Sequence, residues 1–281
     1  MKVCHSIPEI RQQLGDIRNT SIIGFVPTMG ALHQGHVSLV RASKENANVT
    51  VTSIFVNPTQ FNKIEDLEKY PRTLERDLEQ LNSAGCDFVF VPEAHEMYPG
   101  KPEIKIDLGP ITGELEGKFR PGHFNGVGQV VSKLFNIIQP DIAFFGQKDL
   151  QQYYVIQKMI DELNFPVQLQ MVSTQREPNG LAMSSRNMRL SEDDQEHASL
   201  LFRSLLEAKE LLKTSNDIKQ AKSIVRELFD NSNRLELEYF EVVQTTDFKP
   251  LNTVIEQDKT ALCIAAEIGG VRLIDNLLLN S

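Results

Sequence analysis

The sequence predicts an α/β fold, with a doubly wound parallel sheet first and a smaller C-terminal α+β domain after it. Over roughly the first 175 residues, short β-branched runs alternate with helical stretches, which is typical of βαβ units in a parallel sheet. Further along, helices come first and strand-like runs follow them, which indicates a separate α+β unit. The boundary is placed after residue 176, giving domains over 1–176 and 177–281.

Strands and helices alternate regularly in the first domain. The run over 49–57 is rich in Val, Thr and Ile, as half-buried or buried strands are. The stretch over 73–85 places Leu74, Leu78 and Leu81 on one helix face and stops at Gly85. By the same criteria we expect further strands at 21–27, 86–92, 141–146 and 167–174, and further helices at 33–47, 127–140 and 149–164. This order predicts a Rossmann-like sheet.

The second domain opens with a helical stretch over 191–212. Ser191 is a suitable N-cap, and the acidic residues after it suit the positive end of a helix. A second helix is expected over about 216–230. Strand-like runs follow at 235–244, 260–269 and 271–279.

Composition narrows the class of protein. The 281 residues carry a net charge of −9, which argues against a broad nucleic-acid-binding surface. The three cysteines are far apart and form no CxxC pair, so free thiols in a reducing cytoplasm are expected. No apolar run approaches the roughly 18 residues of a membrane span, and the first residues lack the apolar stretch of a secretory signal.

The stretch PTMGALHQGH, from Pro27 to His36, follows the first strand of the predicted alternation. In open α/β sheets, ligands bind beyond the carboxyl ends of strands. His33 and His36 lie one helical turn apart at the start of a helix, where free N–H groups favour anions. Gly30 permits close approach of the backbone to a ligand. The pattern favours a phosphate site over a metal site, because no third metal ligand lies nearby.

Two more strand ends carry groups suited to phosphate. The segment LAMSSRN (181–187) offers two hydroxyls and a guanidinium in succession, although a polar turn alone is also compatible with it. In FFGQKD (144–149), Lys148 can act as a point charge on phosphate. Asp149 can either cap the next helix or accept a hydrogen bond from a ribose hydroxyl. Together the three segments indicate a nucleotide site.

The HxGH pattern after a strand resembles that of the nucleotidyltransferase superfamily. A closer resemblance extends over nearly the whole chain. It rests on segments that occur in the order and with the spacing of the pantoate–β-alanine ligase family: FVPTMGALHQGH, SIFVNPTQF, YPRTLERDL, RPGHFNGVGQVVSKLFNIIQPDIAFFGQKDLQQ, GLAMSSRN and RLIDN.

The resemblance implies that the protein condenses pantoate with β-alanine to give pantothenate, using ATP and Mg²⁺. A pantoyl-adenylate would form first with release of pyrophosphate, and the amine of β-alanine would then displace AMP. This chemistry requires the enzyme to hold charge and orient reactants. The resemblance also implies a cytoplasmic homodimer with small-molecule substrates, and neither nucleic acid nor membrane as a partner.

The resemblance also implies residue roles. His33, His36, Lys148 and Arg186 would be catalytic, with His36 as the proton donor. The ATP-binding residues would be Met29, Gly30, Ala31, Leu32, His33, Gln34, Gly35, His36, Gly146, Gln147, Lys148, Asp149, Gln175, Met183, Ser184, Ser185 and Arg186. Pantoate would contact Gln60 and Gln152, β-alanine would contact Gln60, and Arg120 and His123 would face the phosphates or β-alanine. Asp77 is a candidate ligand of Mg²⁺.

Three other interpretations remain open at this stage. A small class I aminoacyl-tRNA synthetase is one of them, although the chain is acidic and has no obvious RNA-binding module. Another HxGH nucleotidyltransferase, acting on a phosphorylated small molecule, would retain the nucleotide on its product and would not need Gln60 or Gln152. A non-catalytic nucleotide sensor would tolerate loss of groups such as His36 or Lys148, which this chain keeps. The glutamines at 34, 147 and 175 depart from common family residues but remove no phosphate-handling group.

Overall fold

The computed structural model describes residues 1–62, 64–254 and 256–280, and these form two compact units. The N-terminal unit comprises 1–146 and 152–173, and the C-terminal unit comprises 147–151 and 174–281. The main division therefore lies three residues before the expected 176, and a short insert, Gln147–Gln151, belongs to the C-terminal unit. Within the described ranges, no helix is both long and apolar enough to cross a membrane.

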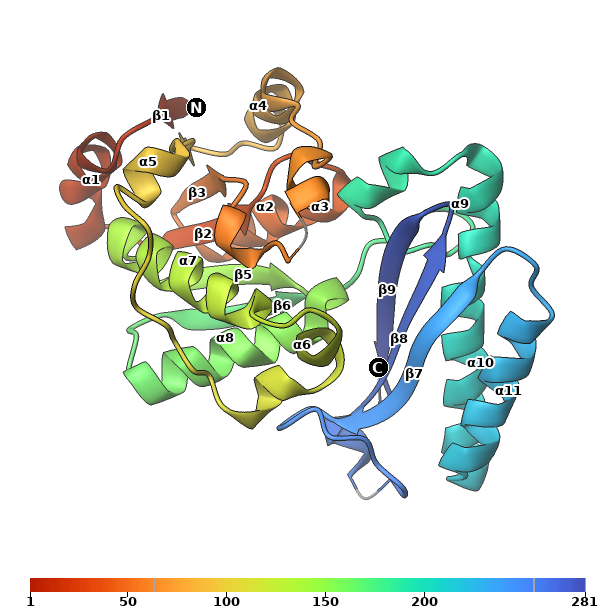
Figure 1. The fold of residues 1–281 in the computed structure, drawn as a ribbon. Coiled ribbons are helices and arrows are strands. Elements are labelled where there is room, and N and C mark those ends of the chain that lie inside the picture. The colour runs from red at the N-terminus through yellow and green to blue at the C-terminus, as the bar shows by residue number, and fades with distance from the viewer. Residues whose placement is uncertain (63, 255, 281) are drawn as a thin grey trace. The chain divides into compact units, whose positions relative to one another are not determined.

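The N-terminal unit is built on a parallel sheet, as predicted, and this sheet has six strands (Figure 1). Its strand order is β1-β4-β3-β2-β5-β6. The strands are β1 (Lys2–Cys4), β2 (Ile23–Thr28), β3 (Val49–Ile54), β4 (Phe88–Phe90), β5 (Ile142–Gly146) and β6 (Gln168–Val172). The edge strand β1 was not predicted.

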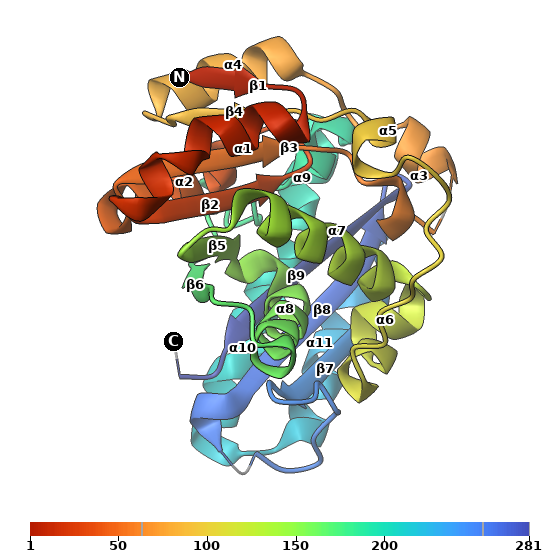
Figure 2. The ribbon, with the colours of Figure 1, turned by 90° about the vertical axis from the view of Figure 1, so that its left-hand side faces the viewer.

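Helices cover both faces of this sheet (Figure 2). The helices α1 (Ile7–Gly15), α7 (His123–Ile138) and α8 (Leu150–Leu163) lie on one face, and α2 (Gln34–Asn46) and α4 (Leu74–Ser83) lie on the other. Right-handed crossovers require this arrangement, because the chain moves outward from β2 in one direction and later returns to β5 on its other side. The direction changes between β2 and β5, so their carboxyl ends flank the switch point at which α/β folds bind ligands.

The sheet is held by apolar residues on both faces. Val26, Val40, Leu81 and Val89 belong to the cluster beneath α2 and α4. On the other side, the rings of Phe25 and Phe135 meet edge to face, with 6.5 Å between centroids. Burial on both faces explains why the strands read as nearly continuous apolar runs. Shorter helices complete the unit: α3 (Ile64–Glu68), α5 (Ala94–Met97) and α6 (Leu115–Phe119).

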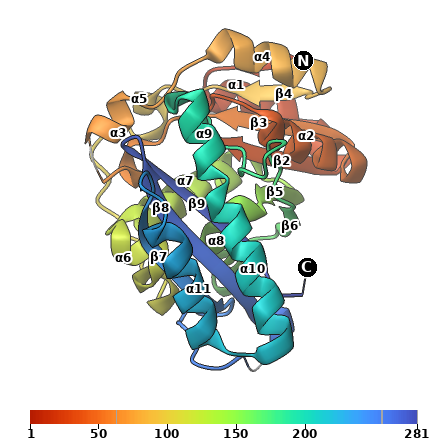
Figure 3. The ribbon, with the colours of Figure 1, turned by 90° about the vertical axis from the view of Figure 1, so that its right-hand side faces the viewer.

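The C-terminal unit is an antiparallel sheet covered by helices (Figure 3). Its strands are β7 (Glu236–Gln244), β8 (Thr260–Ile268) and β9 (Val271–Leu278), and its helices are α9 (Glu192–Ala198), α10 (Leu200–Ser215) and α11 (Ile218–Asp230). Ser191 caps α9 as predicted, accepting from the N–H of Asp194 at 3.1 Å. The prediction of a single helix over 191–212 was wrong, because the helix is interrupted at Ser199, between α9 and α10.

Candidate active site

The two histidines of the HxGH stretch form the N-terminal cap of α2. His33 is the N-cap, and its Nδ1 accepts a hydrogen bond from the N–H of Gly35 at 3.1 Å. Nδ1 of His36 accepts from the N–H of His33 at 3.3 Å, and the ring centroids are 4.1 Å apart. A neutral imidazole that accepts at Nδ1 carries its proton on Nε2. The cap thus fixes the ring tautomers and makes Nε2–H a donor on both histidines.

Asp77 supports the loop that leads into these histidines. Its carboxylate accepts from the backbone N–H groups of Ala31 and Leu32 at 2.9 and 2.8 Å, and from the hydroxyl of Thr73 at 3.0 Å. The side chain is 1% exposed. Gly30, at φ +80°, lies so close that an added Cβ would be 3.0 Å from Oδ2 of Asp77.

Binding of Mg²⁺ by Asp77 stays a prediction. Both oxygens of Asp77 are engaged by donors of its own unit and are withdrawn from solvent, so this carboxylate braces the loop. Over the described ranges, no group of three or more His, Cys, Asp or Glu side chains is placed to hold a metal ion.

Asn57 organises the turn that follows β3. It is 1% exposed, and its Oδ1 accepts from the hydroxyls of Tyr98 and Thr59 at 2.9 and 3.0 Å. Burial raises the pKa of the Tyr98 hydroxyl, which remains a donor at neutral pH. Nδ2 of Asn57 donates to Oε1 of Gln60 at 3.1 Å and to the carbonyl of Gly126 at 3.2 Å.

This network sets the direction of the Gln60 amide. Because Oε1 accepts from Asn57, the Nε2 end points the other way and donates to Sδ of Met29 at 3.0 Å. Gln60 thereby joins the turn after β3 to the loop after β2, two neighbouring strands of the sheet. The predicted substrate contact and the first predicted nucleotide contact lie side by side.

His123 has a supporting position. Its Nδ1 donates to the backbone carbonyl of Gln60 at 2.9 Å, and its Nε2 accepts from Nη1 of Arg120 at 3.3 Å. A ring between a carbonyl and a guanidinium is neutral, with its proton on Nδ1. His123 is 6% exposed and contacts Gln60 and Arg120, and its contact with phosphate or β-alanine stays a prediction.

The insert Gln147–Gln151 presents three predicted site residues within the C-terminal unit. Gln147 is buried, and its Nε2 donates to Oδ1 of Asn276 at 3.4 Å. The side chain of Gln147 is thus directed at β9. Lys148 is half-buried and Asp149 is exposed. Gly146, which precedes them, is the last residue of β5.

A hairpin brings Gln175 beside the SSRN segment. The carbonyl of Gln175 accepts from the N–H of Met183 at 2.9 Å, and the turn contains Gly180 at φ +95°. Oγ of Ser184 then accepts from the N–H of Arg186 at 3.3 Å and starts a short 3₁₀ turn over Ser185–Arg189. Ser185 is buried, whereas Ser184 and Arg186 are half-buried.

The predicted residues thus fall into two groups. The N-terminal unit gathers the Met29–His36 loop, Gln60, Arg120 and His123, and it also carries Gln152, half-buried on α8. The C-terminal unit carries Gln147–Asp149, Gln175 and Met183–Arg186. Asn57 and Asn276 were missed as supporting residues. The Asn-Pro dipeptide at 57–58 is a turn signal that pointed to the first, whereas no local signal marks the second.

Comparisons with known proteins find relatives that match nearly the whole chain. A family model described as pantoate-beta-alanine ligase matches residues 2–278. The chain is 45% identical over 276 residues to a pantothenate synthetase of Cytophaga hutchinsonii, covering 98% of each chain. It is 44% identical over 282 residues to pantothenate synthetase 1 of Bradyrhizobium diazoefficiens, covering 100% of this chain and 99% of the relative.

Solved structures show the same fold. The crystal structure of the Thermus thermophilus pantothenate synthetase superposes with a TM-score of 0.93 at 38% identity, covering 99% of both chains. The Francisella tularensis pantoate-beta-alanine ligase, complexed with beta-gamma ATP and beta-alanine, gives a TM-score of 0.81 at 33% identity, covering 100% of this chain and 98% of that one. This chain belongs to the pantoate-beta-alanine ligase family.

Proposed function

We propose that the protein joins pantoate to β-alanine through a pantoyl-adenylate, with ATP converted to AMP and pyrophosphate. The family match over residues 2–278 carries this proposal. The paired Nε2–H donors of His33 and His36 at the N-terminus of α2 support it, because they suit an anion and lie at the switch point of the sheet.

In the first step, a carboxylate oxygen of pantoate attacks the α-phosphorus of ATP. The bond from this phosphorus to the bridging oxygen breaks, and pyrophosphate leaves with the bond electrons. Negative charge grows on the phosphoryl oxygens and the leaving group. His33 and His36 donate to this charge from Nε2, while Lys148 and Arg186 supply positive charge, and none of them forms a covalent bond.

In the second step, the neutral amine of β-alanine attacks the carbonyl carbon of the adenylate. The amide bond forms, the bond from carbon to the phosphate oxygen breaks, AMP leaves, and the nitrogen releases a proton. Gln60 supports the orientation of pantoate because its amide is fixed by Asn57 and its Nε2 end is a donor. Orientation of this kind accounts for a large part of the rate in reactions between two bound substrates.

Mg²⁺ enters, in this proposal, on the phosphates of ATP. The donor set supports this, since the described residues offer no three-ligand cluster and the Asp77 oxygens are engaged. Mg²⁺ keeps most of its water and is commonly bound through substrate phosphates with few protein ligands. Its part is to neutralise triphosphate charge.

The residues that resemble the family's nucleotide contacts are divided between the two units, and we propose both sets as nucleotide contacts. A cytoplasmic homodimer is expected from the same resemblance, and light scattering coupled to size exclusion tests the oligomeric state.

The deciding experiment measures pyrophosphate and AMP from ATP, Mg²⁺ and pantoate, with and without β-alanine. We expect pyrophosphate release on addition of pantoate, and sustained AMP formation only when β-alanine is present. Transfer of the nucleotide to another acceptor, with no response to pantoate, would overturn the proposal and place the protein among other HxGH nucleotidyltransferases.

A further inference from the structure

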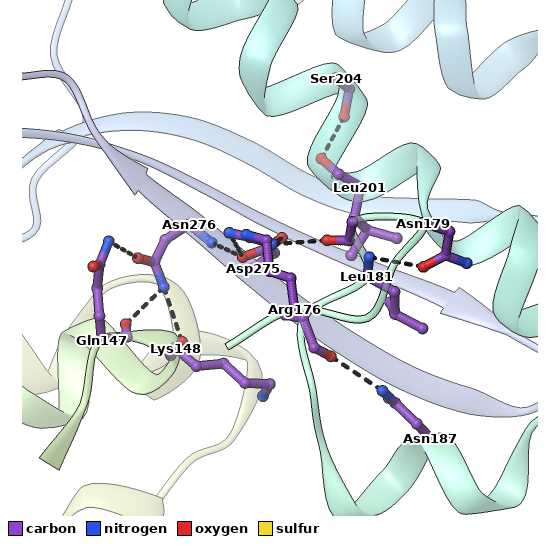
Figure 4. Close-up of polar contacts among 12 residues, drawn as sticks. Gln147, Lys148, Arg176, Asn179, Leu181, Asn187, Leu201, Ser204, Asp275 and Asn276 are labelled. Carbon is purple, nitrogen blue, oxygen red and sulfur yellow. Dashed lines mark hydrogen bonds and ion pairs between the residues drawn. The ribbon is translucent and has the colours of Figure 1, made fainter. Parts of the chain in front are cut away.

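The second half of β9 carries two consecutive buried polar residues, Asp275 and Asn276 (Figure 4), each 3% exposed. Successive side chains of a strand point to opposite faces of the sheet. Asp275 pairs with Arg176, and Asn276 faces the insert that carries Lys148. Burying polar groups costs free energy unless each finds a partner, so the contacts of this pair need an explanation.

The side-chain amide of Asn276 donates hydrogen bonds to the backbone of the insert. Its Nδ2 donates to the carbonyls of Gln147 and Lys148, both at 2.9 Å, and its Oδ1 accepts from Nε2 of Gln147 at 3.4 Å (Figure 4). Two successive carbonyls are thereby tied to one side chain. The insert begins with a short 3₁₀ turn over Gln147–Asp149, before α8 starts at Leu150, so these bonds hold the backbone of that turn.

Asp275 is hydrogen-bonded on the opposite face of the strand. Its oxygens accept from Nη1 and Nη2 of Arg176 at 2.6 and 3.0 Å, and the backbone N–H of Asn276 donates to Oδ1 at 2.8 Å. The Arg176 guanidinium lies 3.7 Å from the ring centroid of Phe202 and also donates to the carbonyl of Gly180. Full burial raises the pKa of Asp275, while Arg176 acts in the opposite direction. The backbone N–H of Asn276 is thus held by Asp275, and its side chain is held by the insert.

We propose that Asn276 is a positioning residue for the reaction: it fixes the backbone of Lys148 so that the ammonium group reaches the triphosphate in a defined place. This rests on the proposed function of Lys148. A lysine has four rotatable side-chain bonds and no planar fork to fix its direction. The placement of its charge therefore depends on the backbone beneath it, and a displacement of about 1 Å can cost roughly 100-fold in rate.

The test compares Asn276→Asp with Asn216→Asp. Both changes replace an Nδ2 donor to a backbone carbonyl within the C-terminal unit, at Lys148 in one case and at Val254 in the other. We expect Asn276→Asp to reduce kcat/KM for pantoate-dependent pyrophosphate release by about 10- to 100-fold. Asn216→Asp should leave it within about 2-fold of wild type.

A double-mutant cycle with Lys148→Ala separates positioning from general structure. If Asn276 acts through Lys148, Asn276→Asp should have little further effect once the lysine is gone. An equal loss in both backgrounds would overturn the proposal, as would wild-type activity of Asn276→Asp. Asn276→Ser removes the two N–H donors of the amide without adding charge, and it replaces the aspartate variant if that variant fails to fold. Wild type is assayed first: no pyrophosphate from it overturns the proposed function, whereas the ratios among active variants decide the role of Asn276.

Discussion

The carboxylate of Asp77 accepts a hydrogen bond from the backbone N–H of Ala31, with 2.9 Å between Oδ2 and the nitrogen. Ala31 adopts φ +51°, a left-handed conformation that is uncommon for a residue with a Cβ. Such backbone persists where the surroundings determine it strongly. The loop that presents His33 therefore depends on a carboxylate 46 positions away along the chain.

Asp77→Asn should destabilise the loop before His33 without changing the Mg²⁺ concentration that the reaction requires. The amide oxygen can serve only one of the two backbone donors, so we expect the free energy of unfolding to fall by about 2–3 kcal/mol. We expect kcat/KM for ATP to fall about 10- to 100-fold. The Mg²⁺ concentration that gives half-maximal activity should not change. The control is Glu75→Gln, because Glu75 is an exposed acid on the same helix. A large rise in the required Mg²⁺ concentration for Asp77→Asn alone would show that Asp77 is a metal ligand.

The two nitrogens of His36 should be separable by substitution. An asparagine amide can place an acceptor near the position of Nδ1, whereas a glutamine amide can place a donor near Nε2. We expect His36→Asn to preserve the cap on the His33 N–H but to lose about 100- to 1,000-fold in the rate of adenylate formation. His36→Gln should retain more activity but lose about 1 kcal/mol of stability with the cap.

The readouts for this pair are pyrophosphate release in a single turnover and the denaturant midpoint of each variant. If both substitutions reduced the rate equally, Nε2–H would not be the group that acts on phosphate. If neither altered stability, the capping role would be excluded.

How much the sequence reveals depends on the range of each interaction. The strand over β2 and the histidine pair after it were predicted because periodicity, turn residues and capping act over a few positions. The partners of His123 and Asn276 were not, since Gln60 lies 63 positions from the first and Lys148 lies 128 positions from the second. Nor did periodicity reveal the break at Ser199, because apolar spacing continues into α10. The role of Asp77 in bracing the loop was missed for a related reason: a carboxylate in the sequence does not reveal that it accepts hydrogen bonds from backbone N–H groups far along the chain.

Gly126 should tolerate no side chain, because α7 lies directly on the turn that carries Gln60. A Cβ at this position would meet the carbonyl oxygen of Thr59 at 2.3 Å and the backbone nitrogen of Gln60 at 2.7 Å. In an open helix, a change from Gly to Ala stabilises by up to about 1 kcal/mol. Here we expect Gly126→Ala to destabilise by about 2–3 kcal/mol and to raise the KM for pantoate.

Gly15→Ala is the matched control for this substitution, since Gly15 also lies in a helix and a Cβ there would meet nothing within 4 Å. The unfolding midpoint should be lower, and the KM for pantoate higher, in Gly126→Ala than in Gly15→Ala. Equal behaviour of both would mean that α7 does not fix the Gln60 turn.

Alkaline pH should weaken the N-terminal unit through Cys86. Burial raises the pKa of this thiol from 9.0 to about 11, with a smaller opposing effect from the Thr52 hydroxyl. In the unfolded chain the thiol loses its proton near its ordinary pKa, whereas the folded protein keeps this proton until the pH is higher. The unfolded state therefore binds fewer protons between about pH 9 and 11. Because of this difference, the free energy of unfolding falls as pH rises through this window, by an amount on the order of 2–3 kcal/mol from this group.

The matched variant is Cys86→Ala, which removes the titrating thiol but leaves the lysines and tyrosines that also titrate in this pH range. Chemical unfolding across this range should show that the wild type loses stability more steeply than the variant. Parallel curves would mean that folding does not raise the pKa of the Cys86 thiol.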